Sequence, residues 1–364
     1  MEDIEPVLSR YEQQHYGTSR VQQYLSAQRA KLGAPSGRQR IEASPFFESR
    51  DVAGIDVLNA FETVFRVESA SGIHIAKICN SRHDEIRINQ ILSAAHAGFV
   101  APMLAADDAG IAVFARCEPL FDEAALEGDY AELQRNMERA AELLAEIHAL
   151  SPEGMPRSQL KVPINRFSRL TLAEYAQLPG FEIQRYLEAA QSLQVSLAYA
   201  ESAQGTCFIH GDFKFDNIMC HAGRLVAIDW ETAGQGRREA DLGTFLGCLA
   251  TLWLKDKSRS YDGSIRGILN RGDIGLVRCV MLMDRFLSTY ATHLPGRIDI
   301  HLLVLYAGKF LMDRGLVANL LGGRFNLETS LCFGLGQALI RSPLRMAALC
   351  KGLIQHELEH RHYG

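Results

Sequence analysis

The sequence lacks several features that identify whole classes of protein. Its eight cysteines form no Cys-x-x-Cys pair, which argues against a zinc ribbon and against a disulfide framework. Charge is nearly balanced, with a formal net charge of -5 over 364 residues, so no strong basic field indicates nucleic acid as a partner. Hydrophobic residues make up 47% of the chain, which excludes intrinsic disorder. What remains is an ordinary globular protein.

The sequence also lacks a long apolar run. Its longest charge-free stretch, residues 88–106, includes Asn, Gln, His and Pro and is too polar for a membrane span, which needs roughly 20 mostly apolar residues. The acidic start, residues 1–5, has neither the basic nor the apolar region of a signal peptide. We therefore expect a cytoplasmic protein with no membrane partner.

Changes of texture along the chain divide it into three segments. Residues 1–45 are polar and predict a helical extension that ends in a loop. Residues 46–116 contain short apolar runs separated by turns, which predicts a small sheet-rich lobe. Residues 117–364 have mostly helical periodicity. A sheet-rich lobe followed by a larger helical lobe predicts an α+β fold.

Within these segments, periodicity predicts individual elements. The expected elements are a hairpin of strands at 61–67 and 73–78, a helix at 84–95, strands at 99–105 and 111–115, helices at 129–150 and 182–203, a loop-and-strand region at 206–229, and helices from 241 onward.

Two apolar strands of the helical lobe frame an unusual polar cluster. The first runs into His210-Gly-Asp212-Phe-Lys214-Phe-Asp-Asn217, and the second ends at Asp229-Trp-Glu. A carboxylate beside an apolar strand is costly to bury without a cation or hydrogen-bond donors. Asp229 and Asn217 offer the hard oxygen ligands that Mg²⁺ prefers. Asp212 precedes Asn217 by five positions, the spacing of a catalytic-loop base and a metal-binding amide.

A plainer interpretation of the same residues is structural. His210 and Asp212 would then cap a turn, and Asp229 would cap the start of a helix. Three acidic or amide groups at matching spacing, each beside an apolar strand, favour the functional interpretation.

The two motifs, His-Gly-Asp-x-x-x-x-Asn and Ile-Asp-Trp-Glu, resemble the catalytic and metal motifs of the aminoglycoside phosphotransferase and choline kinase-like family. The resemblance spans both lobes and implies a bilobal, protein-kinase-like fold. It also implies phosphorylation of a hydroxyl group by Mg²⁺ and ATP, with GTP left open as the donor. Asp212 would be the catalytic base, with His210 and Lys214 beside it, and Asn217 and Asp229 would hold the metal.

The same resemblance implies a nucleotide clamp in the sheet-rich lobe. Lys77 interrupts an apolar strand and would contact the α and β phosphates. Glu85 fits the helix position that pairs with this lysine, although Asp84 and Glu68 are alternative partners.

Two further parts of the clamp follow from position in the chain. Phe114, Ala115 and Cys117 lie where the lobes join, and their backbone would bind adenine, unless this segment is a plain linker. Asn59 begins the loop that would cover the phosphates. That loop departs from the glycine-rich pattern of protein kinases, since no glycine occurs between Gly54 and Gly72.

One residue beyond the metal motif has an expected structural role. Asp241 follows a Gly-Gln-Gly-Arg-Arg segment and resembles the aspartate that braces the catalytic loop in this family.

The acceptor is less determined than the chemistry. Residues 297–364 include eight Lys and Arg but only five Asp and Glu, so this region is mildly basic. A polycationic aminoglycoside would favour an acidic wall. Choline would favour an aromatic cage, for which the rings nearby are Tyr306, Phe310, Phe325 and Phe333. A small-molecule hydroxyl is the first interpretation.

Two alternatives stay open. Residues 163–175 resemble a segment of kinase-like proteins that phosphorylate Ser or Thr of a precursor peptide together with a partner lyase, so a peptide acceptor and a partner enzyme are possible. A pseudokinase scaffold, which binds nucleotide without turnover, is the other, and the glycine-free loop is its support.

A third motif points elsewhere. His356-Glu-Leu-Glu-His360 matches the zinc-binding pattern His-Glu-x-x-His. It lies in a charged tail at the end of the chain, where histidines near the negative pole of a helix are the better interpretation.

Overall fold

The computed structural model describes residues 35–48, 50–59, 63–79, 85–95, 98–121, 126, 129–158, 207–259, 275–322, 327–349 and 351. The chain forms two compact units. The first, here called the sheet unit, comprises residues 1–118, 219–231 and 318–324. The second, the helix unit, comprises residues 119–218, 232–317 and 325–364.

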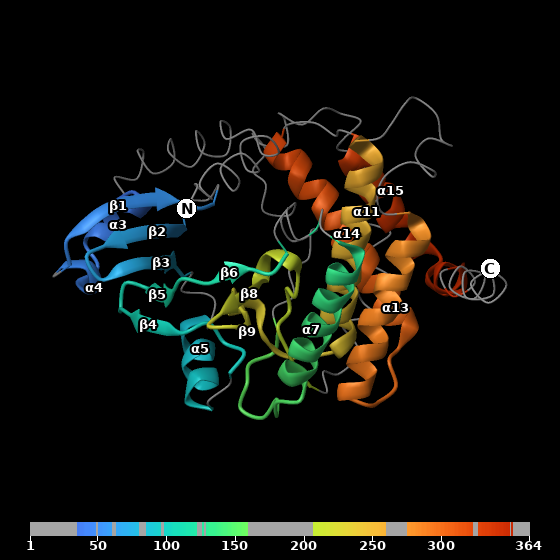
Figure 1. Ribbon diagram of the computed structural model, residues 1–364, viewed down its shortest axis with the longest axis horizontal. Helices are drawn as coiled ribbons and strands as arrows, with labels where there is room; N and C mark the ends of the chain where they lie inside the picture. Colours follow the sequence, from blue (N-terminus) through green and yellow to red (C-terminus); the bar gives the residue numbers. More distant parts are fainter. Residues whose placement is uncertain are drawn as a thin grey trace. The chain divides into compact units, whose positions relative to one another are not determined.

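The sheet unit is built on a five-stranded antiparallel sheet, drawn in blue to green in Figure 1. Its strand order is β1-β2-β3-β5-β4. The strands are β1 (Val52–Val57), β2 (Val64–Ser69), β3 (Gly72–Ile78), β4 (Met103–Ala106) and β5 (Ile111–Ala115). The expected hairpin is present as β2 and β3, and Gly72 supplies the positive φ of +120° at its turn. The strand expected at 99–105 is shorter, and β1 was not foreseen.

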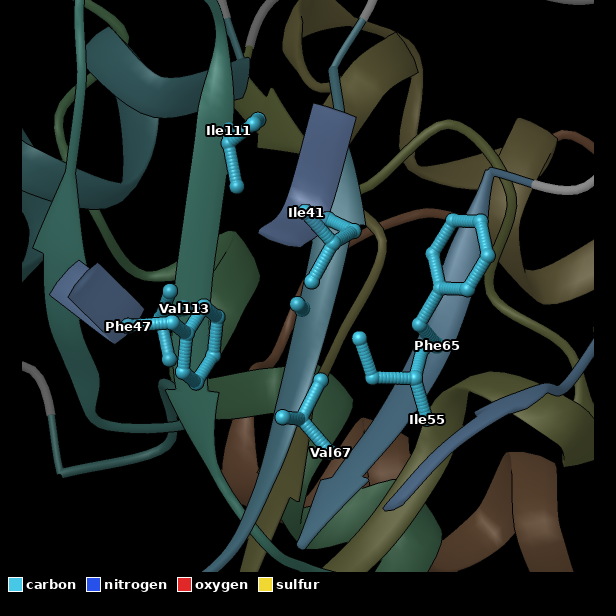
Figure 2. Close-up of a cluster of buried hydrophobic side chains, with 8 residues drawn as sticks. Ile41, Phe47, Ile55, Phe65, Val67, Ile111 and Val113 are labelled. Carbon is cyan, nitrogen blue, oxygen red and sulfur yellow. The ribbon is translucent and has the colours of Figure 1, made fainter. Parts of the chain in front are cut away.

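Two short helices cover one face of this sheet where a loop was expected. Helix α3 (Gly37–Glu42) begins at a capping box formed by Ser36 and Gln39, and α4 (Pro45–Glu48) follows. Ile41 and Phe47 are buried in a core with sheet residues, as Figure 2 shows. The other fully or largely buried members of this core are Ile55, Phe65, Val67, Ala76, Ile111 and Val113. Ile41, which lies before residue 46, thus contributes a side chain to this core.

Three further elements complete the described part of the sheet unit. Helix α5 (Glu85–Ala94) confirms the helix expected at 84–95. Strands β8 (Ile218–His221) and β9 (Arg224–Ala227) form a hairpin, in which Ala222 and Gly223 both have positive φ, as a tight hairpin turn requires. Ala227 donates its N–H to Phe99 O at 2.7 Å, which ties the end of β9 to the segment before β4.

The helix unit consists mainly of long helices. They are α7 (Tyr130–His148), α11 (Arg238–Arg259), α13 (Leu276–His293), α14 (Ile300–Gly322) and α15 (Leu327–Arg341). Asp129 caps α7 through the Ala131 N–H, which confirms the helix expected from residue 129. The helix expected at 182–203 lies outside the described residues. A short antiparallel pair, β7 (Cys207–Ile209) and β10 (Gly234–Gly236), precedes α11.

Aromatic rings fill the core of the helix unit next to β7. Phe245 of α11 stacks on Phe286 of α13, with ring centroids 4.1 Å apart. Phe213 and Phe215, which follow β7, contact the same ring at 5.7 and 5.2 Å. The core therefore holds the loop after β7 by two side chains.

Among the described residues, no helix is both long and apolar enough to cross a membrane.

The core under α3 gives a first prediction. Ile41→Ala should lower the free energy of unfolding by about 2–5 kcal/mol, because it leaves a cavity where the side chain is fully buried. Urea unfolding followed by circular dichroism measures this. Val57→Ala, at a side chain that is 44% exposed on the same sheet, is the control and should change stability by less than about 1 kcal/mol. Equal effects of the two substitutions would contradict a core role for α3.

Candidate active site

Lys77 lies at the centre of a buried charge cluster in the sheet unit. Its neighbour Ala76 faces the core under α3, so the alternation of β3 turns Lys77 to the opposite face. The ammonium Nζ lies 2.8 Å from the Glu85 carboxylate of α5 and 2.5 Å from Asp229 Oδ1. Of the alternative partners, Glu68 pairs with Arg66, and Asp84 lies outside the described residues.

The charges of this cluster stabilise one another. Burial alone would lower the pKa of Lys77, but the Asp229 and Glu85 carboxylates outweigh it and raise that pKa above its ordinary value. Burial raises the pKa of Glu85, whose side chain is 2% exposed, and the Lys77 ammonium opposes that rise. Lys77 is therefore a fixed cation at neutral pH.

Asp229 is held in an uncommon backbone conformation. Its φ is +66°, in the left-handed region that non-glycine residues seldom adopt. Trp230 anchors the segment, because its buried ring packs against Phe99 and its Nε1 donates to Ala227 O at 3.0 Å. A residue held in this region against its intrinsic preference is typical of functional sites.

A third carboxylate joins the cluster. Single oxygens of Glu85, Asp229 and Glu231 all lie within 4.8 Å of one another. With Lys77 the group carries a formal charge of about -2 when all are ionised, which suits a divalent cation. Sequence reasoning assigned no role to Glu231, although a second carboxylate two residues after Asp229 was the available signal.

In the helix unit, buried phenylalanines alternate with polar side chains along the loop after β7. Phe213 and Phe215 are buried in the aromatic core described above. The side chains between and before them are partly exposed: Asp212 Oδ2 lies 2.9 Å from Lys214 Nζ, at exposures of 14% and 24%. This alternation keeps a carboxylate and an ammonium together at the surface of a rigid loop.

Asn217 is locked at the end of the same loop. It closes a 3₁₀ turn (Phe215–Asn217), is buried, and its Nδ2 donates to Asp212 O at 2.9 Å. The amide oxygen Oδ1 is thereby the atom left to ligate a cation. Because Asn217 and Asp229 belong to different units, their sharing of one metal stays a prediction.

Asp241 braces the loop as expected. Its Oδ2 accepts the His210 N–H and its Oδ1 accepts the Gly211 N–H, each at 2.7 Å. His210 is fully buried, and its Nδ1 accepts the Asp212 N–H at 3.3 Å. His210 was expected among the catalytic residues; the structure places its ring in the core beside the loop, so any effect on catalysis would act through Asp212 and its neighbours.

Asn59 also has another role than expected. Its Oδ1 accepts the N–H groups of Thr63 and Val64, at 2.9 and 3.1 Å, and its Nδ2 donates to Thr63 Oγ1 at 2.8 Å. The side chain thus closes the turn between β1 and β2 instead of presenting a group to a nucleotide. Residues 60–62 lie outside the described residues.

The segment expected to bind adenine ends β5. Phe114 pairs with Ile75 in the sheet, and the Ala115 N–H donates to Pro102 O at 2.9 Å. The N–H of Ala115 is therefore committed to the protein. Burial raises the pKa of Cys117 to about 11, so that thiol stays protonated at neutral pH. Backbone groups of Cys117 remain the candidates for adenine.

Two sequence motifs lie outside the described residues. They are the His-Glu-x-x-His pattern at 356–360 and the segment 163–175.

Solved structures with the same fold are numerous, though remote in sequence. The choline kinase LicA from Streptococcus pneumoniae matches with a TM-score of 0.52 and 15% identity, over 84% of this chain and 100% of that one. The aminoglycoside phosphotransferase APH(4)-Ia matches with a TM-score of 0.50 and 13% identity, over 84% of this chain and 98% of that one. These matches confirm the α+β, kinase-like fold.

Sequence comparison gives the family. No curated protein matches the chain at a significant level. A family model does, over residues 52–268, which is more than half of the chain and includes Lys77, Asp212 and Asp229. Its description is the phosphotransferase enzyme family. The chain therefore belongs to this family of phosphotransferases.

Proposed function

We propose that this phosphotransferase moves the γ-phosphoryl group of ATP to a hydroxyl group of a small molecule. The observation that carries the proposal is the buried Lys77, held between a helix carboxylate, Glu85, and a strand-end carboxylate, Asp229. A lysine fixed in this way is suited to the α and β phosphates of a nucleotide. Structures of the same fold also support a nucleotide donor, since LicA was solved with AMP and a variant of APH(4)-Ia with AMP-PNP.

The donor atoms available fit a magnesium ion. In this proposal Asp229 and Glu231 would contribute carboxylate oxygens, and Asn217 would contribute a neutral amide oxygen. Both carboxylate oxygens of Glu85 lie 2.8 Å from Lys77 Nζ, so we assign Glu85 to orienting the lysine. When bound, Mg²⁺ supplies charge neutralisation on the phosphate oxygens. Lys77 would act beside it as the protein's own cation.

Asp212 is the proposed catalytic base. Its carboxylate is partly exposed on a loop whose backbone is fixed by Asp241 and whose neighbouring side chains are buried in the core. A base in such a loop orients the acceptor hydroxyl and takes its proton as the phosphoryl group transfers. Lys214, 2.9 Å away, forms an ion pair with that carboxylate and can itself meet a phosphate oxygen.

The described helices give little support to choline or an aminoglycoside as acceptor. Tyr306 and Phe333 are buried, so they cannot form a cage around a quaternary ammonium. Asp216, exposed in the catalytic loop, has Arg314 of α14 at 3.9 Å, so a cation of the chain already accompanies this carboxylate. These features favour a neutral or anionic hydroxyl compound over a polycation.

The two alternatives differ from this proposal in measurable ways. A peptide acceptor with a partner lyase would give phosphorylated Ser or Thr, and its supporting segment lies outside the described residues. A pseudokinase scaffold would bind nucleotide without turnover. The presence of Asp212, Asn217 and Asp229 in one chain argues against the scaffold.

The metal assignment gives a second prediction. Asp229→Asn should abolish phosphoryl transfer and weaken Mg²⁺-ATP binding by about tenfold or more, because one ligand charge is lost while Glu85 still accompanies Lys77. Calorimetric titration measures the affinity, and thermal unfolding verifies the fold. Asp56→Asn removes an exposed carboxylate of the same unit and should bind like the wild type. Unchanged affinity and activity in Asp229→Asn would rule out the assignment.

The base assignment gives a third. Asp212→Ala should keep nucleotide affinity within about twofold of the wild type and lower the transfer rate by about 10²–10⁴-fold. Phosphate incorporation from labelled ATP into pools of small alcohols and of Ser- or Thr-containing peptides measures the rate and separates the two acceptor classes. Asp216→Ala, the exposed neighbour in the loop, is the control. If Asp212→Ala supports every function of the wild type, Asp212 is not the catalytic base.

A further inference from the structure

A buried polar chain leads from α13 to the catalytic loop. The Tyr290 hydroxyl lies 2.8 Å from His148 Nδ1, and His148 Nε2 lies 3.0 Å from Asp241 Oδ2. Asp241 in turn accepts the N–H groups of His210 and Gly211. Tyr290 and Asp241 are fully buried and His148 is 4% exposed. All five residues belong to the helix unit, so the chain does not depend on how the two units sit.

The hydrogen-bond partners favour one arrangement of hydrogens along this chain. Asp241 already accepts two backbone N–H groups, and its Oδ2 lies 3.0 Å from His148 Nε2, where it can accept a third hydrogen bond. A neutral His148 with its proton on Nε2 has a bare Nδ1. That nitrogen must then accept, and the Tyr290 hydroxyl is the donor facing it.

The environment of Tyr290 agrees with this direction. Burial, with smaller contributions from neighbouring charges, raises the pKa of Tyr290 well above its ordinary value. The hydroxyl therefore keeps its proton at neutral pH and can donate it in a hydrogen bond.

The backbone of the catalytic loop is closely packed at Gly211. Gly211 has a φ of +83°, and a Cβ there would lie 2.6 Å from Thr232 O and 2.9 Å from Ser158 Oγ. Thr232 also donates its Oγ1 hydroxyl to His210 O at 3.2 Å. A change in how Asp241 holds the two N–H groups is thus passed along the backbone to Asp212, the next residue.

We propose that Tyr290 is a positioning residue for phosphoryl transfer: it holds His148 in the Nε2–H tautomer, and His148 thereby fixes Asp241 on the catalytic loop. Tyr290 acts through two other side chains and does not touch the substrate. The proposal rests on the proposed function for its catalytic consequence, but the tautomer and the loop contacts can be measured without any acceptor.

The first arm of the test is spectroscopic. Full-length protein labelled with ¹⁵N-histidine should show His148 as a single Nε2–H tautomer, assigned with His148→Gln. Tyr290→Phe should give a mixture of tautomers. Hydrogen exchange at the His210 and Gly211 amides should then accelerate about tenfold more than at Phe208 of β7, because only the loop loses its brace.

Matched variants separate positioning from packing. Leu282→Val trims a buried side chain of the same helix and should leave the tautomer and the relative exchange rates unchanged. His148→Gln supplies an amide N–H in place of Nε2–H that needs no tautomer selection. In that background Tyr290→Phe should change loop exchange by less than about twofold, so the two substitutions are not additive.

Activity supplies the third arm. For whichever acceptor pool is phosphorylated, Tyr290→Phe should lower kcat by about tenfold with KM for ATP unchanged, since the base is misplaced and the nucleotide clamp is intact.

Defined outcomes would overturn the proposal. A dominant Nδ1–H tautomer in the wild type would do so even if Tyr290→Phe does not fold. Equal acceleration of exchange at all amides in Tyr290→Phe, or full additivity with His148→Gln, would mean that Tyr290 only packs. A protein that binds no ATP but shows the expected tautomer and exchange would instead refute the proposed function and keep the brace.

Discussion

The structure of the sheet unit depends on one constraint, the neutralisation of the Lys77 ammonium. The side chain is 14% exposed, and an isolated charge there would be costly to bury. Glu85 and Asp229 reach it from a helix and from the end of a hairpin, so one contact fixes three segments that are distant in the chain. The left-handed backbone at Asp229 is the local cost of that arrangement. In the proposed function this lysine binds the nucleotide phosphates, and the ion pairs hold it in one position beforehand.

The helix unit holds the loop after β7 in a fixed position. Two phenylalanines anchor the loop in an aromatic core, and Asp241 holds its backbone N–H groups. Asp212 and Lys214 lie next to these buried phenylalanines. Their neighbours limit the motion of Asp212, whose side chain remains partly exposed. Positioning and charge are most of what phosphoryl transfer requires of a protein, so the proposed function relies on the fixed positions of these two segments.

Sequence reasoning succeeded where the signal was local and failed where it was not. The hairpin around Gly72 and the helix from Glu85 follow from periodicity over a few residues, and the resemblance of the motifs led to the brace at Asp241. Ile41 looked like part of a polar extension, because nothing in its local sequence indicates contact with a sheet that begins 11 residues later. Asn59 was placed at the nucleotide because it begins the loop expected to cover the phosphates, and its position in the sequence does not show its hydrogen bonds to Thr63 and Val64. The contact between Tyr290 and His148 joins residues 142 apart, and no pattern of single residues predicts such a pair.

The central claim is that the carboxylates around Lys77 serve a metal-bound nucleotide. The most direct test is calorimetric titration of the wild-type protein with ATP at constant ionic strength, with Mg²⁺ and with excess EDTA. The account predicts that Mg²⁺ tightens ATP binding by about tenfold or more, because Glu85, Asp229 and Glu231 repel the bare triphosphate and attract its magnesium complex. ATP that binds equally well in EDTA, or does not bind in either condition, would contradict it.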